Sequence, residues 1–340
     1  MPVHWLSNAV VVALFAGAVG LGVLLRRNRL WGEAARQLVR RRPLALGVIG
    51  LYAAVALLDS VAWVGGGAVE GDAVAAHQAR SVIDRLFAGT QEATYSAPLA
   101  ETEFYADVPL RRPGTHLLGT DILGRDVLYL TFKGARVALL IGGLTSLIAI
   151  PLALLFGVSA GYFGGRLDDA VFFVMSTLAS IPGLLLLIAL IMAMGRSTLS
   201  VCIALGITSW VGFSRLARGE TLKLRELDYV QAARALGVSE LRIVFRHILP
   251  NLMHLVIITF VLMFSGLVLS EAILAWLGIG LDGSWGQMID QARDELSREP
   301  VIWWNLGAAG VALFGLLLAV NFVGDALRDI LDPRTLRDVP

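Results

Sequence analysis

Residues 136–162 read RVALLIGGLTSLIAIPLALLFGVSAGY, a run with one charge at its first position and none after it. As a helix rising about 1.5 Å per residue, such a run crosses the roughly 30 Å hydrocarbon core of a bilayer. The whole chain has a matching composition, because 56% of its 340 residues are apolar and only 16% are charged. Soluble domains carry about 25% charged residues. With a mean hydropathy of +0.72, the sequence therefore predicts an all-α, polytopic transmembrane helix bundle.

Further stretches are apolar enough and long enough to span: residues 8–25, 44–64, 170–194, 199–213, 252–277 and 301–323. The stretch at 8–25 is interpreted as a retained helix, because no arginine or lysine precedes it and no small-residue cleavage site follows it. About seven transmembrane helices are expected. Pro151 and Pro182 lie inside spanning stretches and are expected to mark kinks.

The positions of the arginines predict the orientation. The loop after the first helix contains Glu33 as its single acid, against Arg26, Arg27, Arg29, Arg36, Arg40, Arg41 and Arg42. By the positive-inside rule this loop is cytoplasmic, which makes the N-terminus periplasmic and the C-terminus cytoplasmic. The predicted segments are an extra N-terminal transmembrane helix with a basic cytoplasmic linker (1–43), a transmembrane helix (44–64), a periplasmic segment (65–133), a core transmembrane domain (134–325) and a cytoplasmic tail (326–340).

The loop over residues 214–250 is too charged to enter the bilayer. It contains Arg215, Arg218, Lys223, Arg225, Arg234, Arg242 and Arg246 with Glu220, Glu226, Asp228 and Glu240, and each such charge costs roughly 3 kcal/mol at a bilayer centre. A first short helix is predicted from the spacing of Tyr229, Ala232, Ala233 and Leu236, and Gly237 ends it. A second begins at Ser239 as its cap, presents Leu241, Val244, Phe245 and Ile248 as an apolar stripe, and is closed by Pro250. Insertion into a groove on another protein and attachment to lipid headgroups both fit this pattern.

The run QAARALGVSELRIVFRHILPN, residues 231–251, resembles the Glu-Ala-Ala loop of permease subunits in ATP-binding-cassette importers. The family pattern is present at Ala232, Ala233, Gly237, Ile248 and Pro250, and it differs at Gln231, where the family often has glutamate. The resemblance implies that this loop docks into a nucleotide-binding subunit and transmits its closure. The residues expected to couple to that subunit are Tyr229, Gln231, Ala232, Ala233, Gly237 and Pro250.

A second motif lies before the third helix, in THLLGTDILGRDVLYLTFKGARVAL (residues 115–139). It is similar to a segment of dipeptide and oligopeptide permeases, matched at His116, Gly119, Thr120, Asp121, Gly124, Arg125 and Asp126. GYFGGRLDD (161–169), SEAILAWLGIGLDGSWGQM (270–288) and NFVGDALRDILDPR (321–334) extend the resemblance to about two thirds of the chain. The motif also has a structural interpretation: glycine turns, a cap from Asp121, and an Arg125–Asp126 pair that fixes the segment against its neighbours.

The resemblance implies the type I importer permease fold and half of a translocation path for peptides, with nickel or another small solute as the alternative. A secondary transporter is a weaker alternative. The implied partners are a second, non-identical permease, two nucleotide-binding ATPase subunits, a periplasmic substrate-binding protein and membrane lipid, with no nucleic acid. Only Lys133 and Lys223 are lysines, and neither lies in a Gly-Lys-Ser/Thr site, so ATP and Mg are expected on the partner subunits and no cofactor or catalysis in this chain.

Two residues near the outer end of the sixth spanning helix are candidates for the path or the subunit seam. Glu271 is the acid expected at membrane depth, where a carboxylate is a functional candidate by default. A proton relay and contact with a partner or with the outer mouth of the path are its alternatives, and the second is favoured. Ser270 is expected to cluster with Gly142, Gly143 and Ser146 on faces turned towards a second permease, against packing within the subunit.

Overall fold

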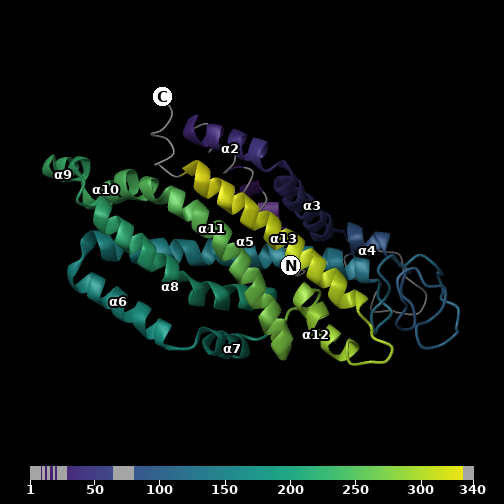
Figure 1. Cartoon of the computed structure of the whole chain (residues 1–340). Coiled ribbons are helices and arrows are strands. Elements are labelled where there is room, and N and C mark those ends of the chain that lie inside the picture. The colour runs from purple at the N-terminus through teal and green to yellow at the C-terminus, as the bar shows by residue number, and fades with distance from the viewer. Residues whose placement is uncertain are drawn as a thin grey trace. The chain divides into compact units, whose positions relative to one another are not determined.

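The computed structural model describes residues 29–63 and 80–331, together with scattered helical positions between residues 9 and 20 (Figure 1). Its α-helices are α2 (Arg29–Arg41), α3 (Pro43–Ser60), α4 (Val82–Leu86), α5 (Val127–Phe163), α6 (Gly165–Ser180), α7 (Gly183–Met194), α8 (Thr198–Leu224), α9 (Asp228–Ala235), α10 (Glu240–Ile243), α11 (Leu249–Leu274), α12 (Trp285–Glu295) and α13 (Trp304–Leu331). Two π-helical turns flank α11, η2 (Val244–Ile248) and η3 (Ala275–Ile279). Strands β1 (Ala62–Trp63) and β2 (Arg80–Ser81) form a short antiparallel pair.

The expected all-α membrane bundle is confirmed. Within the described residues, five helical segments are long and apolar enough to cross a membrane, or six if the bent pair α6–α7 is one span. The fifth expected stretch, 199–213, is longer than predicted, because α8 continues to Leu224. The first expected helix, 8–25, lies outside the described residues apart from its scattered positions.

A span over residues 170–194 with a kink at Pro182 was expected, and the bend at Pro182 is confirmed. The segment is two helices, α6 and α7, bent by 91° at their junction. Pro182 holds the N-cap of α7, and Ile181 before it is extended at φ −87° and ψ 131°, as the steric demand of a following proline favours. Pro151, in contrast, lies inside the unbroken helix α5.

The chain divides into two compact units, each made of two stretches of sequence: Met1–Leu140 with Val268–Val323, and Ile141–Leu267 with Gly324–Pro340. The bounds of these units differ from those of the segments predicted from the sequence. In the first unit, α3 contacts α13 through the Tyr52 hydroxyl, which donates to the Ala312 carbonyl at 2.9 Å. Lys133 lies between two carboxylates, with Nζ 2.7 Å from Asp59 and 2.7 Å from Asp84. These contacts tie the end of α3 and helix α4 to the first turns of α5.

The 115–126 motif is a network of turns in the first unit. Gly119 and Gly124 have positive φ of 72° and 69°, as predicted. Arg125 donates to Asp121 at 2.7 Å, so its partner lies within the motif itself. Asp121 caps the turn through the amides of residues 123 and 125, while Asp126 caps α5 through the amide of residue 128. Asp126 was therefore the helix cap that the sequence analysis missed.

His116 lies between two acids at the centre of this network. Its Nδ1 is 2.9 Å from Asp126 and its Nε2 is 3.3 Å from Glu92, and its side chain is buried. Burial alone would raise the pKa of Glu92, but the backbone amides of Arg111 and Arg112 and the His116 ring lower it below its ordinary value. The motif is thus held in place by bonds within the chain, which agrees with the structural interpretation given to it above.

Glu295 is another buried acid in the first unit and is the last residue of α12. Tyr95 and Asn305 donate to its Oε1, each at 3.3 Å, and its Oε2 has no hydrogen-bond partner among the described residues. Burial raises the pKa of Glu295 above its ordinary value, and the donors Asn305 and Tyr95 offset only part of that rise. The protonated acid is therefore the form that this site favours.

We expect Glu295→Gln to make the protein more stable at pH 7.5 and to leave its stability unchanged near pH 4. An acid whose folded-state pKa is raised stabilises the fold fully below its unfolded pKa, and this contribution is lost as pH rises through the folded pKa. Thermal unfolding in detergent between pH 4 and 8 measures the effect, with an expected rise of about 2 °C or more at the alkaline end. A difference between variant and wild type that does not change with pH would contradict this explanation.

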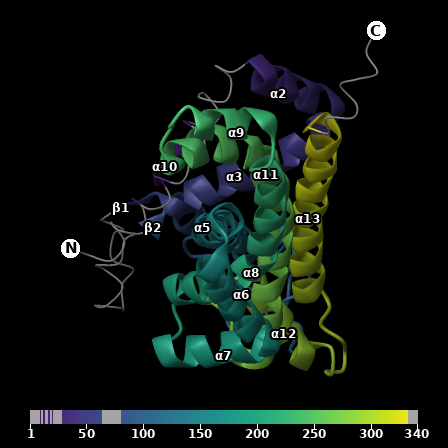
Figure 2. The same cartoon turned by 90° about the vertical axis from the view of Figure 1, so that its left-hand side faces the viewer.

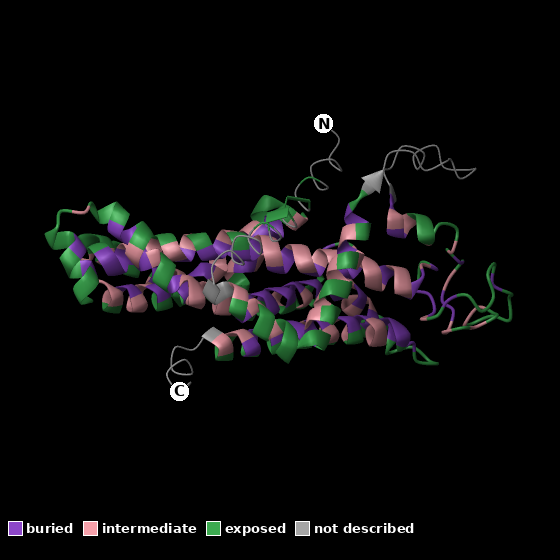
Figure 3. Cartoon of the chain, turned by 90° about the horizontal axis from the view of Figure 1, so that it is seen from above, coloured by how far each residue is buried: buried purple, intermediate pink, exposed green. Residues whose placement is uncertain are grey.

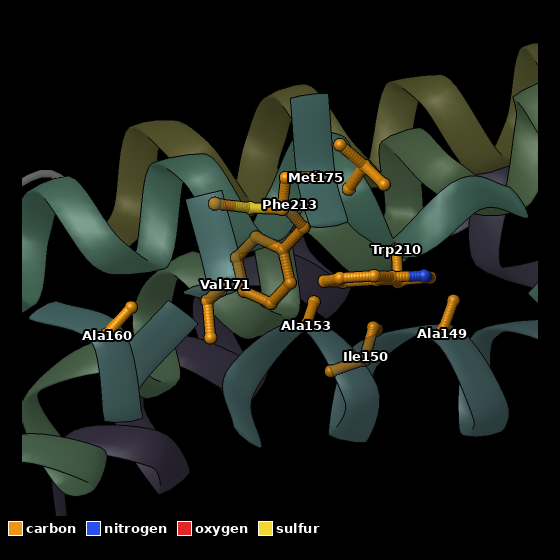
Figure 4. Close-up of a cluster of buried hydrophobic side chains, with 9 residues drawn as sticks. Ala149, Ile150, Ala153, Ala160, Val171, Met175, Trp210 and Phe213 are labelled. Atoms are coloured by element: carbon orange, nitrogen blue, oxygen red, sulfur yellow. The ribbon is translucent and has the colours of Figure 1, made fainter. Parts of the chain in front are cut away.

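The second unit is built on close contacts among α5, α6 and α8. Trp210 and Phe213 of α8 point towards the small residues Ala149 and Ala153 of α5, and Met175 of α6 completes the cluster (Figure 4). Figure 3 shows buried and exposed residues next to one another along the helices. This pattern is typical of helices with one face in a bundle.

Helices α5 and α8 approach each other at backbone distance. Gly157 and Gly161 are four residues apart on α5, and a Cβ added to them would lie 2.4 Å from the Ser214 carbonyl oxygen and 2.7 Å from that of Arg218. This is the small-xxx-small pattern that lets membrane helices pack closely. The α5–α8 contact therefore requires glycine at both positions.

Candidate functional site

The candidate site is the segment between α8 and α11, where α9 and α10 lie side by side (Figure 2). Helix α9 ends in a Schellman motif. Val238 donates to the Ala233 carbonyl at 3.1 Å, Gly237 donates to the Arg234 carbonyl at 3.0 Å, and Gly237 has a φ of 76°. The predicted sequence of helix, glycine turn and helix is confirmed. Ser239 holds the N-cap of α10, but its side chain makes no capping hydrogen bond, so this part of the prediction is wrong.

One side of this segment is packed. Val230, Ile243 and Ile248 are fully buried, and they contact Val158 and Tyr162 near the end of α5. Side chains on three consecutive elements, α9, α10 and η2, therefore share one small core with α5. A segment with such a core moves as a body rather than as a flexible loop.

The other side is exposed, and it carries four apolar side chains among charged ones; we call these four residues the outer face. It consists of Tyr229, Leu236, Leu241 and Phe245, whose exposed fractions are 44%, 84%, 63% and 67%. The apolar stripe predicted for the second helix is thus divided, because Val244 and Ile248 are buried while Leu241 and Phe245 are exposed. A π-helical turn accommodates one extra residue, so positions three apart, such as 241 and 244 or 245 and 248, lie on different faces through η2. Clustered apolar side chains on a surface are typical of a protein or membrane contact.

Three sets of polar contacts, which we call clamps, join the segment or the end of α8 to a neighbouring helix. Arg218 of α8 donates twice to Asp168 of α6, at 2.6 Å from both Nε and Nη2, a bidentate pair of the strong kind. Arg225 donates from Nη1 to the Gly161 carbonyl of α5 at 2.9 Å. The clamps fix the end of α8 against both α5 and α6.

A third clamp reaches α10. The Tyr162 hydroxyl of α5 bonds Glu240, and Arg234 of α9 lies 3.5 Å from the same carboxylate, with its guanidinium 5.4 Å from the Tyr162 ring centre. Sequence analysis did not identify these clamp residues. Asp168 and Tyr162 do lie in GYFGGRLDD, a stretch that the resemblance included, but no spacing rule links them to partners 50 and 78 positions away.

The structure brings the predicted coupling residues of α9 together. Tyr229 is held by Asn251, whose Nδ2 donates to the tyrosine hydroxyl at 3.1 Å. The Gln231 side chain donates from Nε2 to the Arg225 carbonyl at 2.9 Å, so it is bonded to the end of α8. Ala232 is exposed beside them and Ala233 is buried beneath. The small residues thus leave room for close approach, while Gln231 fastens the start of α9.

Pro250 does not close the unit, and the prediction that it does is wrong. It lies in the first turn of α11, which continues to Leu274. Proline cannot donate a backbone hydrogen bond to the preceding turn, and the π-helical turn η2 directly before it accommodates the change in hydrogen bonding. The segment therefore passes into a membrane helix without a break.

The two seam candidates lie in the first unit. Glu271 is 5% exposed, and its Oε1 accepts from the Leu281 amide at 3.5 Å; Ser270 before it is half-buried. In the second unit, Gly142 packs under the Phe264 ring and Ser146 donates to the Gly142 carbonyl, whereas Gly143 has open space beside it. Gly143 therefore has room for another helix to approach, while Gly142 does not.

These features define a class of protein: a multi-pass membrane bundle with a packed helical segment that exposes apolar side chains. Residues 153–337 match the family described as "Binding-protein-dependent transport system inner membrane component". The chain belongs to this family.

Several curated proteins are similar over about two thirds of the chain. The dipeptide transport system permease protein DppC of Bacillus subtilis is 36% identical over 65% of this chain and 70% of its own length. The di/tripeptide transport system permease protein DppC of Pseudomonas aeruginosa is 35% identical over 71% and 82%, and the oligopeptide transport system permease protein OppC of Haemophilus influenzae 35% over 65% and 71%. A solved structure of the MetNI methionine ABC transporter aligns with a TM-score of 0.48 at 20% identity, over 60% of this chain and 97% of that one.

Proposed function

We propose that this chain is a permease subunit of an ATP-driven peptide importer, and that its outer face docks on a nucleotide-binding ATPase subunit. The observation that carries the proposal is the outer face itself: four exposed apolar side chains on a segment whose other side is packed against α5. An amphipathic helix inserted in a groove is a common form of protein recognition.

The proposed orientation follows the arginines. The loop with α2 and the segment with α9 and α10 are cytoplasmic, the N-terminus is periplasmic and the C-terminus is cytoplasmic. In this orientation the segment with α9 and α10 faces the side of the membrane on which ATPase subunits bind. ATP and Mg then belong to two such partners, and a periplasmic binding protein delivers the solute on the opposite side.

The proposed mechanism is a rigid-body push. Closure of the ATPase subunits displaces the outer face, and the three clamps pass the displacement to α5, α6 and α8, because each clamp joins the segment or the end of α8 to a neighbouring helix. Gly237 forms the turn that keeps α9 and α10 together in this body, since its φ of 76° is strained for other residues. Motions of this kind are gating movements of packed helices.

The proposed cargo is peptide. Three similar permeases are named for dipeptide, di/tripeptide and oligopeptide transport, which favours peptide over nickel. The path is shared with a second, non-identical permease, because two bundles facing each other can enclose a water-filled cavity.

Expression of this chain without a second permease should give no ATP-dependent peptide uptake in proteoliposomes. Addition of the partner permease, the ATPase subunits and the binding protein should restore it, because each half supplies only one wall of the path. The measurement is accumulation of labelled dipeptide with and without ATP. Uptake by a complex that contains this chain as its sole membrane subunit would contradict the proposal.

A further inference from the structure

Helix α2 and the residue after it are not part of the docking segment or of the clamps. Arg42 is the single residue between α2 and Pro43, the first residue of the membrane-length helix α3. Its backbone is non-helical, with φ −134° and ψ 55°, so α2 is a separate helix rather than an extension of α3. Because consecutive Cα atoms are about 3.8 Å apart, this short joint keeps the end of α2 at the level where α3 enters the membrane.

Contacts within the first unit hold α2 in this place. The Arg42 guanidinium lies 5.2 Å from the centre of the Phe322 ring of α13, a cation–π distance. The Arg42 amide donates to the Leu38 carbonyl at 2.9 Å, and Ala34 is buried. Arg42 is therefore held against α13, and α2 is joined through it to the start of α3.

The exposed side of α2 is basic with apolar residues among the charges. Arg36, Arg40, Arg41 and Arg42 are exposed, and so are Val39 of α2 and Leu44 in the first turn of α3, at 57% and 85%. Glu33 is the single acid of α2. Among the described residues, Gly32, Ala35, Arg36 and Val39 line a hollow of about 450 Å³ along the helix. A basic amphipathic helix of this kind is typical of the membrane surface.

We propose that α2 with Arg42 is a membrane-surface helix that binds the phosphate headgroups of anionic phospholipids. The joint at Arg42 sets the helix at headgroup level, where Val39 and Leu44 reach apolar acyl chains and the guanidinium groups reach phosphates. Guanidinium forms paired hydrogen bonds with phosphate, and clustered arginines beside a transmembrane helix attract anionic lipid. An acidic patch on an ATPase subunit is the competing occupant. The position at the membrane entry favours lipid.

The test uses the full transporter complex in detergent, titrated with phosphatidylglycerol or phosphatidylcholine and followed by native mass spectrometry. Arg40→Gln/Arg41→Gln should lower the apparent affinity for phosphatidylglycerol by about tenfold or more and leave that for phosphatidylcholine unchanged. Arg111→Gln/Arg112→Gln, an exposed adjacent pair in the first unit outside α2, is the matched control and should bind as wild type. Arg40→Lys/Arg41→Lys should recover most of the binding, which distinguishes lost charge from a misfolded helix.

Three results would overturn the proposal. The first is unchanged phosphatidylglycerol affinity in the glutamine variant. The second is equal displacement of the lipid by inorganic phosphate at the same concentration, which would mark a simple anion site. The third is loss of the ATPase subunits from the glutamine variant with lipid binding intact, which would assign the arginines to the protein partner.

Discussion

Replacing Leu236 and Phe245 together by glutamate is expected to abolish ATP-dependent uptake while the chain still folds. Both side chains are on the outer face, 84% and 67% exposed, so charge there meets only water in the isolated subunit. In a docked complex the same charges would be buried without partners, which costs several kcal/mol in the interface. Binding of the ATPase subunits should fall by about 100-fold or more, since each 1.4 kcal/mol is a factor of ten.

Copurification of the ATPase subunits with the tagged chain measures this loss, with thermal unfolding of the chain as the check on folding. Leu123→Glu is the matched control, since Leu123 is 54% exposed but belongs to the 115–126 motif in the first unit. It should retain the ATPase subunits. If the double variant copurifies with them at the wild-type ratio, the outer face is not the docking surface.

The second large effect is expected from Gly157→Leu. Even the first carbon of a side chain at this position would lie 2.4 Å from the Ser214 carbonyl oxygen, a backbone atom that cannot rotate away. Helices α5 and α8 would have to separate, which strains the Arg225–Gly161 clamp between them. Overpacking of this type costs about 1–3 kcal/mol or more, so a large fall in thermal stability and loss of uptake should occur together.

Gly143→Leu provides the comparison on the same helix, because a Cβ there meets nothing within 4 Å. It should unfold at the wild-type temperature. Fluorescence-detected size-exclusion chromatography after stepwise heating compares the two variants directly. Equal unfolding temperatures for Gly157→Leu and Gly143→Leu would show that the close contact between α5 and α8 is not required.

Hydrophobicity alone was enough to predict most of the fold. Long apolar runs identify membrane helices because the bilayer demands about 20 residues for each, and α3, α5, α8, α11 and α13 are all near their predicted positions. A kink at Pro182 was predicted, but the size of the bend between α6 and α7, 91°, was not. A proline within an apolar run is compatible with a kink or with a new helix, and tertiary contacts decide between them.

The helices and the glycine turn of the site were predicted from the sequence, but the residues exposed on its outer face were not. The spacing of Tyr229 and Leu236 and the glycine after them predicted α9 and its turn. Spacing could not assign Leu241 and Phe245 to the exposed side, because the π-helical turn η2 changes the register and is not encoded by a recognisable motif. The clamps join residues that are far apart in the sequence, so they appear only when the helices are packed.

Cross-linking from a cysteine at position 236 tests the central claim most directly. In a Cys202→Ala background, which removes the chain's one buried native cysteine, Leu236→Cys carries a photoactivatable thiol reagent in the assembled complex. The predicted result is a cross-link from position 236 to the nucleotide-binding subunit, and none from Leu123→Cys treated in the same way. Equal cross-linking from both positions, or none to the ATPase subunit from position 236 in an active complex, would contradict the account.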